Sequence, residues 1–221
     1  MSDGHRTKAR QLADDSIARG EPLAWFDELY AAAEGDTAKI PWADLEPNPN
    51  LILWHTTTRY DFSGQRVLKI GCGLGDDCEY LQSAGGIVSG FDISRTAIEW
   101  CKRRFPGSGV EYSANDLFNV PKDWSGSFQF VLESYTLQVL PPDLRPRAMD
   151  AISGLVADGG TLLVICRARH ETSPVGQMPW PITKQELLGF GERGLTLEKL
   201  EDYHDDETPP VHRFRAMYRR A

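Results

Sequence analysis

Apolar runs alternate with amphipathic stretches from residue 66 to the end of the chain. The runs predict seven strands, at 66–71, 86–91, 109–113, 127–133, 160–166, 194–200 and 212–219. Apolar residues at helical spacing between them predict helices near 76–84, 94–104, 143–156 and 183–190. This alternation is typical of an α/β fold with a doubly wound, seven-stranded, mostly parallel sheet. Because a polar loop at 202–210 separates the last two strands, we expect an antiparallel C-terminal hairpin at one edge.

The first 60 residues show a different pattern. Two helices are predicted at 7–19 and 22–34, divided by Gly20 and Pro22. A proline-broken connection follows, and then a short helix that contains Trp54. We therefore expect residues 1–60 to form an N-terminal helical cap on a core of residues 61–221, within one structural domain.

Three glycines directly follow the first predicted strand. Gly71, Gly73 and Gly75 lack Cβ atoms, so the chain can turn sharply there and bring backbone N–H groups against a ligand. The second predicted strand leads into Asp92, and a carboxylate at a neighbouring strand end can bind the two hydroxyls of a ribose. Asp77 would repel phosphate and attract a cationic amine. The pattern thus favours S-adenosylmethionine over NAD or FAD.

Composition narrows the class of protein. The chain has 221 residues and a formal net charge of −8, which disfavours a general nucleic-acid binder. Its longest apolar runs are too short to cross a bilayer, and its polar start lacks a secretory apolar core, so we expect a cytoplasmic protein without a membrane partner. The four cysteines show no metal-ligand spacing, and we expect no metal site.

Several motifs occur in an order and spacing that suggest a known family. They are IPW at 40–42, GCGLGDD at 71–77, GFDIS at 90–94, ND at 115–116, LPPDLR at 140–145, GGTLLVI at 159–165 and GQMPWPITKQEL at 176–187. Together they resemble the class I S-adenosylmethionine-dependent methyltransferases, most closely the thiopurine, thiol and halide methyltransferase group. The resemblance implies a Rossmann-like methyltransferase fold.

Two departures from the wider family refine this resemblance. Lys69 stands where many class I methyltransferases carry an acid that supports the methionine end of the cofactor. The thiopurine-like group tends to have an acid shortly after the glycines instead, which Asp77 matches. The segment ESYTLQ at 133–138 lacks the Asp/Asn-Pro-Pro-Tyr motif of enzymes that methylate nucleic-acid bases or protein glutamine. We therefore expect neither of those substrates.

The resemblance also implies a set of cofactor-binding residues. Asp92 would hold the ribose hydroxyls, Ile93 would pack on the adenine, and Asp116 beside Leu117 would read the adenine amino group. Glu133 would contact the methionyl amine or the substrate. The alternatives are an N-cap role for Asp116 and a solvated strand-end role for Glu133. The whole set is Trp42, Gly71, Gly73, Gly75, Asp77, Asp92, Ile93, Asp116, Leu117 and Glu133.

Acceptor recognition is predicted from aromatic and cationic side chains in the cap and loops. The candidates are Trp25, Tyr30, Trp42, Tyr135, Arg167 and Trp180. Tyr135 is the candidate catalytic residue, as a hydrogen-bond donor or weak base. Arg167 is expected to pair with a substrate carboxylate or with Glu171. A stripe of core packing is the alternative for Trp25 and Tyr30 of the second helix, and a loop anchor is the alternative for Trp180.

We interpret the chain as an enzyme that methylates a small-molecule acceptor, with a thiol favoured. A thiol provides some thiolate near neutral pH, and the five histidines show no pairing that would indicate a general base. An O- or N-methyltransferase of a small aromatic metabolite is the alternative, followed by a non-catalytic cofactor-binding module. An NAD-dependent reductase is disfavoured by Asp77 and by the lack of a Tyr-x-x-x-Lys pair. The expected oligomeric state is a monomer or a weak homodimer.

Overall fold

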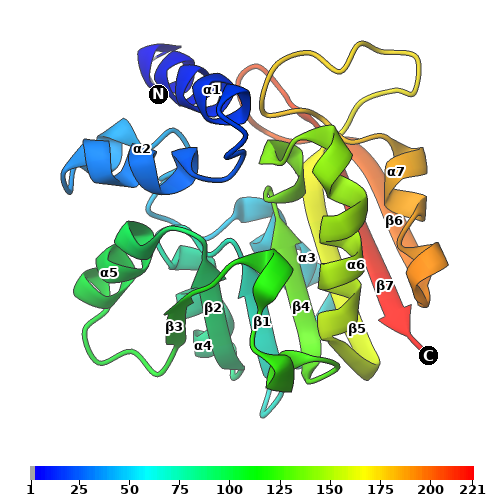
Figure 1. Cartoon of the computed structure of the whole chain (residues 1–221). Coiled ribbons are helices and arrows are strands. Elements are labelled where there is room, and N and C mark those ends of the chain that lie inside the picture. Colours follow the sequence, from blue (N-terminus) through cyan, green and yellow to red (C-terminus); the bar gives the residue numbers. More distant parts are fainter. Residues whose placement is uncertain (1–2) are drawn as a thin grey trace.

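A computed structural model of the chain describes residues 3–221, and its centre is a seven-stranded sheet (Figure 1). In spatial order the strands are β3 (Glu111–Ala114), β2 (Ile87–Asp92), β1 (Arg66–Ile70), β4 (Phe128–Ser134), β5 (Val156–Arg167), β7 (His212–Arg220) and β6 (Leu195–His204). The first five pair in parallel, whereas β7 lies antiparallel between β5 and β6. The predicted mostly parallel sheet and its antiparallel edge hairpin are confirmed.

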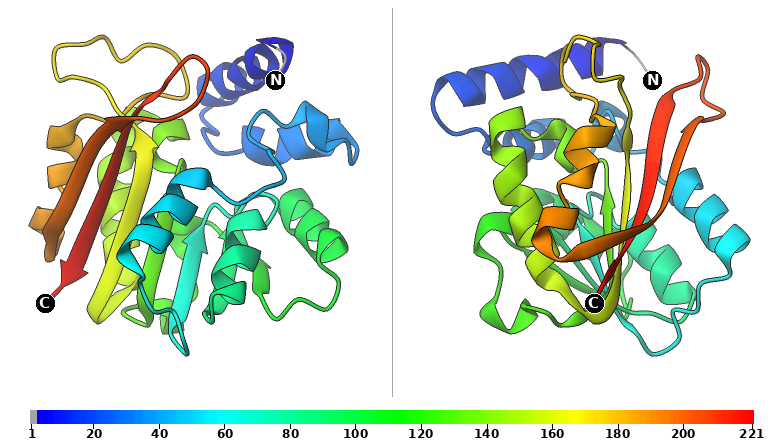
Figure 2. Two further views of the ribbon diagram at one scale, coloured as in Figure 1. Left: turned by 180° about the vertical axis from the view of Figure 1, so that it is seen from behind. Right: turned by 90° about the vertical axis from the view of Figure 1, so that its right-hand side faces the viewer.

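Helices cover both faces of this sheet. One face packs against α3 (Pro49–Thr58), α4 (Asp76–Ser83) and α5 (Arg95–Arg104), and the other against α6 (Arg145–Leu155) and α7 (Lys184–Leu188). Figure 2 shows the two sets on opposite sides of the strands. Single 3₁₀ turns lie in the connections, at Thr37–Lys39, Leu117–Asn119, Lys122–Trp124, Leu137–Val139, Pro142–Leu144 and Gly191–Arg193. The buried apolar rows of the strands therefore meet a helix layer on either side.

Two further helices lie over the carboxyl edge of the sheet. These are α1 (Asp3–Ala18) and α2 (Trp25–Ala33), at the top of Figure 1. They join a hydrophobic cluster with Leu74 of the glycine loop and Trp100 of α5. By contrast, Leu51 and Trp54 of α3 are buried against the face of the sheet. The first 60 residues therefore cover two parts of the sheet, since α1 and α2 lie over its carboxyl edge and α3 packs on one of its faces.

Three predicted boundaries are wrong by four residues, because α1 begins at Asp3, β6 continues to His204 and β5 begins at Val156. The helix predicted at 143–156 ends at Leu155, and β5 begins at Val156, four residues before the predicted strand. The pairing of β5 with β4 shifts register between Phe128 and Phe130, opposite Asp158, Gly159 and Gly160. Such an irregularity lets glycines sit inside a strand, so the turn-like sequence there does not end the strand.

No helix in residues 3–221 is long and apolar enough to cross a membrane.

Candidate functional site

The glycine loop lies between the carboxyl end of β1 and the start of α4. Gly71, Gly73 and Gly75 have φ values of 58°, 54° and 93°, a left-handed region that side chains other than glycine rarely adopt. A Cβ added at Gly71 would come within 2.4 Å of Thr136 Oγ1, and one at Gly75 within 2.5 Å of the Tyr112 hydroxyl. At Gly73 the nearest atom would be 3.5 Å away. An atom added at Gly73 would therefore make an ordinary contact with the Tyr30 hydroxyl, whereas one added at Gly71 or Gly75 would clash.

Asp92, at the end of β2, faces this loop as predicted. One carboxylate oxygen accepts a hydrogen bond from the Gly73 N–H at 3.0 Å and the other from the Ser94 N–H at 2.9 Å. Burial raises the pKa of Asp92, and the two N–H groups work against that rise. Since each carboxylate oxygen can accept more than one hydrogen bond, both keep capacity for the two hydroxyls of a ribose.

Lys69 has an unexpected role beneath the loop. Its buried ammonium donates to the carbonyl oxygens of Ile70 at 2.8 Å, Gly71 at 3.1 Å and Ser134 at 3.4 Å. Asp77 lies 4.0 Å away and accepts the Asn48 N–H at 2.8 Å. Burial raises the pKa of Asp77, which Lys69 counteracts. The lysine at the position of the usual acid therefore ties the turn to the end of β4.

Glu133 is fully buried near the end of β4, so the alternative of a solvated strand-end acid is wrong. Its Oε1 accepts the N–H groups of Thr136 at 2.8 Å and Leu137 at 2.9 Å. Among residues 3–221 its Oε2 finds no hydrogen-bond partner, although it is buried. Burial raises the pKa of Glu133 to about 7, a rise that these N–H groups and the charge of Lys69 limit. A buried acid with one unused oxygen is a candidate partner for a polar ligand.

Tyr135 occupies a strained turn directly after β4. Its φ of 67° is unusual for a large side chain, and such outliers concentrate at functional sites. The ring stacks under the Arg213 guanidinium at 4.7 Å, and the hydroxyl accepts a hydrogen bond from the Asn50 amide at 3.0 Å. Burial raises the pKa of Tyr135. The phenol is thus held in its protonated form, which suits a hydrogen-bond donor better than a base.

The aromatic candidates of the cap pack together above the loop. Trp25 and Tyr30 are each 1% exposed, so the core-packing alternative holds for these side chains in this conformation. Tyr30 accepts a hydrogen bond from Trp42 Nε1 at 2.8 Å, and its hydroxyl is the atom nearest to a Cβ placed at Gly73. Trp42 and Trp180 are half-buried at the border of this cluster. The structure therefore brings Tyr30 and Trp42 to the loop, where a cofactor would meet them.

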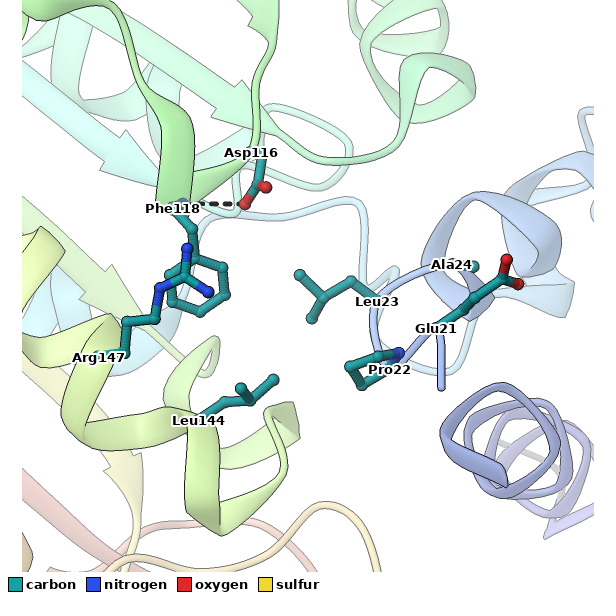
Figure 3. Close-up of a pocket in the computed structure, with 8 residues that line it drawn as sticks. All are labelled: Glu21, Pro22, Leu23, Ala24, Asp116, Phe118, Leu144 and Arg147. Atoms are coloured by element: carbon teal, nitrogen blue, oxygen red, sulfur yellow. Dashed lines mark hydrogen bonds between the residues drawn. The ribbon is translucent and has the colours of Figure 1, made fainter. Parts of the chain in front are cut away.

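Asp116 caps the short 3₁₀ turn Leu117–Asn119 by accepting the Phe118 N–H at 2.9 Å, so its N-cap role is confirmed. It also lines a pocket of 420 Å³ (Figure 3). The other lining residues are Glu21, Pro22, Leu23, Ala24, Phe118, Leu144 and Arg147. Leu117 packs in the core and Ile93 is half-buried. An adenine contact from Leu117 would therefore have to come from its backbone.

Arg167 ends β5 and is half-buried. The predicted alternative, an ion pair with Glu171, is wrong, since the Glu171 carboxylate accepts the Gln185 N–H at 2.9 Å instead. The Arg167 backbone N–H donates to Gln138 Oε1 at 2.6 Å. Within residues 3–221 the Arg167 guanidinium forms neither an ion pair nor a hydrogen bond with another side chain or the backbone.

Two asparagines near the start of α3 belong to the site, and the sequence reasoning missed them. The Asn48 amide donates to Ser134 Oγ at 2.8 Å, and Asn50 accepts a hydrogen bond from the Tyr203 hydroxyl at 2.7 Å. The run Pro47-Asn48-Pro49-Asn50 does carry a local signal, because asparagine before proline is typical of a helix start. That signal predicts a cap, which Asn48 provides, but says nothing of contacts with β4 and β6.

The residues present fit S-adenosylmethionine. The left-handed turn at Gly73, the open acceptor capacity of Asp92 and the unpartnered Oε2 of Glu133 lie at the carboxyl ends of β1, β2 and β4. Ligands of open α/β sheets bind at this edge. A cationic ligand also matches the carboxylates gathered there, whereas pyrophosphate does not.

Comparisons with known proteins agree with this assignment. A family model described as "Methyltransferase domain" matches residues 67–160. The phthiotriol/phenolphthiotriol dimycocerosates methyltransferase of Mycobacterium leprae is 31% identical over 162 residues, which cover 72% of this chain and 58% of that protein. The fatty-acid O-methyltransferase of Mycolicibacterium smegmatis is 33% identical over 122 residues, covering 53% and 42%. The chain thus spans less than two thirds of the length of these curated relatives.

Solved structures show the same fold. The N-methyltransferase NodS of Bradyrhizobium japonicum, determined with S-adenosyl-L-homocysteine, superimposes with a TM-score of 0.67 at 20% identity over 88% of this chain and 99% of that one. The chain therefore matches the methyltransferase-domain family over residues 67–160, and it has the fold of these methyltransferase structures. Its closer resemblance to the thiopurine, thiol and halide group stays a prediction.

Proposed function

We propose that the protein transfers the methyl group of S-adenosylmethionine to a small-molecule nucleophile, with a thiol as the preferred acceptor. The observation that carries the proposal is the meeting of the left-handed glycine turn with Asp92, whose two oxygens are aligned by backbone N–H groups. The relatives' names add phthiotriol dimycocerosates and fatty acids to the acceptors to be tested.

The cofactor supplies an activated methyl group on a sulfonium, with a neutral thioether as leaving group. The chain has to hold that group and an acceptor in line, and such positioning can lower a barrier by roughly 7–11 kcal/mol. Asp92 would fix the ribose and the glycine turn would admit the methionyl part, while Trp42 and Tyr30 would cover it. Tyr135, at the end of β4, would donate a hydrogen bond to the acceptor.

The surroundings of Tyr135 favour an acceptor that needs no general base. Burial raises the pKa of Tyr135, so the phenol is a poor base near neutral pH. None of the five histidines contacts Tyr135 or Asp92 within residues 3–221, and His55, for example, bonds to the Tyr80 hydroxyl at 2.8 Å. Carboxylates reach the site ionised and thiols partly so, whereas a phenol or a protonated amine would have to lose a proton there.

The proposal is tested first by calorimetric titration with S-adenosylmethionine, S-adenosylhomocysteine and NAD. We expect micromolar binding of the two adenosyl compounds and none of NAD. Turnover of thiols, phenols and fatty acids should then be followed by mass spectrometry of the products. Failure of both adenosyl compounds to bind would refute the proposal, and Tyr135→Phe with little loss of rate would exclude a phenolic base.

A further inference from the structure

Resting on the proposed function, we propose that Arg167 is an acceptor-binding residue and that the acceptor carries a carboxylate. Arg167 is the last residue of β5, one strand away from the turn at Tyr135. The carboxyl ends of β4 and β5 lie side by side because the two strands are parallel and paired through Ser134 and Ile165. Arg167 is therefore placed beside the acceptor rather than beside the adenosine.

Arg167 differs from the neighbouring buried arginines, which are paired with carboxylates. Arg213, directly opposite it on β7, bonds to Asp205 at 2.6 Å and also to Glu207. Other buried guanidinium groups are paired too, since Arg145 contacts Glu186 at 2.6 Å and Arg215 contacts Glu201 at 2.6 Å. Arg167 has no carboxylate within 4.0 Å in the described part of the chain. Its five N–H donors are left for water or for a ligand.

Leaving the Arg167 guanidinium without an anionic partner, beside the charge of Arg213, costs free energy. Opposite residues of an antiparallel pair share a face, so two cations at 167 and 213 repel each other. Burial lowers the pKa of Arg167 and the charge of Arg213 lowers it further, while Glu207 and Tyr135 have the opposite effect. An anion bound at Arg167 would relieve the repulsion. A carboxylate suits the planar guanidinium because it can accept two parallel hydrogen bonds.

The Arg167 side chain is available to bind a ligand. The backbone of Arg167 is fixed on both sides, by its N–H to Gln138 and by its carbonyl, which accepts the Ile182 N–H at 2.9 Å. The side chain is only half-buried, and within residues 3–221 it makes no hydrogen bond or ion pair that a ligand would have to break. A rigid backbone with an unused guanidinium is the arrangement of a binding residue rather than of a structural cross-link.

The inference is tested by binding to the whole chain loaded with S-adenosylhomocysteine. Decanoate, benzoate and 3-mercaptopropionate would be titrated, each beside its uncharged primary amide. We expect at least one carboxylate to bind more tightly than its amide. Arg167→Gln should weaken the binding of that carboxylate about 10- to 100-fold, about 1.4–2.8 kcal/mol, and leave the binding of its amide unchanged. The affinity of Arg167→Lys for the carboxylate should lie between those of the wild type and Arg167→Gln. Lysine keeps the positive charge but lacks the paired N–H donors of the guanidinium.

Arg103→Gln is the matched control, because it removes one cation from an exposed position on α5. It should leave carboxylate binding unchanged. The inference is overturned if no carboxylate binds better than its amide, if Arg167→Gln binds carboxylates as the wild type does, or if both Arg167 variants lose S-adenosylhomocysteine binding, which would make the residue structural. Carboxylate binding can also be measured on the unloaded chain. A failure of the cofactor to bind, which would refute the proposed function, is therefore distinguished from a failure of Arg167.

With active protein, steady-state rates give a second readout. For 3-mercaptopropionate, Arg167→Gln should raise KM about 10- to 100-fold with little change in kcat, and the KM of its amide should stay as it is. An equal loss for acid and amide would contradict recognition of the carboxylate.

Discussion

Replacing Glu133 by glutamine should change how the stability of the protein depends on pH. Glu133 is fully buried, and its pKa is raised to about 7 by burial. Its Oε1 accepts two backbone N–H groups, whereas its Oε2 has no partner in the part of the chain that the structure describes. The substitution keeps an oxygen for the two N–H groups and removes the ionisable proton.

The sign follows from proton binding. Because the pKa in the folded state lies above the value of 4.5 in the unfolded chain, the native protein binds more protons between about pH 4.5 and pH 7. The free energy of unfolding of the wild type therefore falls as the pH rises through this window. At about 1.36 kcal/mol per pKa unit, the loss between pH 5 and pH 8 is about 2–3 kcal/mol.

The assay is urea unfolding, followed by tryptophan fluorescence at pH 5, 6, 7 and 8. Other titrating groups act on both proteins, so the quantity of interest is the wild-type stability minus that of Glu133→Gln. This difference should fall by about 2–3 kcal/mol from pH 5 to pH 8. Glu99→Gln, at an exposed position, is the control and should show a constant difference. A constant difference for Glu133→Gln as well would refute the raised pKa.

Three further substitutions test the cofactor site and the core. Asp92→Ala should weaken S-adenosylmethionine binding by about 1–3 kcal/mol in calorimetry, and an unchanged affinity would remove Asp92 from the site. Gly71→Ala should lower the free energy of unfolding by roughly 1–3 kcal/mol, because φ is 58° and the new Cβ would meet Thr136 Oγ1; a melting temperature equal to that of the wild type would contradict this. Trp54→Ala, at a buried position in α3, should cost about 3–5 kcal/mol in urea unfolding, and a loss below 1 kcal/mol would mean that α3 is not packed on the sheet.

The order of the elements could be predicted because each signal is local. A buried parallel strand such as β1 is a short apolar run, and the glycines after it end it. The boundary between α6 and β5 could not be predicted in the same way. Asp158, Gly159 and Gly160 resemble a turn, yet the pairing of Val156 and Thr161 with β4 on either side keeps this stretch within β5. Tertiary contacts prevailed there over local propensity.

The residues of the site likewise fall into those that the sequence predicts and those that depend on tertiary contacts. Gly73 and Asp92 were predictable, since parallel strands bring the residues after β1 and β2 to one edge. The roles of Asn48 and Arg213 were not, because they depend on contacts that α3 makes with β4 and that β7 makes, across β5, with the turn after β4. Their partners, Ser134 and Tyr135, are 86 and 78 residues away in sequence. No periodicity or spacing reports such contacts.

Lys69 shows how one such contact changes the interpretation of a motif. From sequence, Asp77 was expected to attract the methionyl amine because it follows the glycines. In the structure, Lys69 offsets the charge of Asp77 at 4.0 Å, and Asp77 holds Asn48, so Asp77 supports the loop. The acid with an unused oxygen at this edge is Glu133. An amine placed there would lower the pKa of Glu133, because a nearby cation favours the carboxylate. Cofactor binding should therefore reduce the pH dependence of stability that distinguishes the wild type from Glu133→Gln.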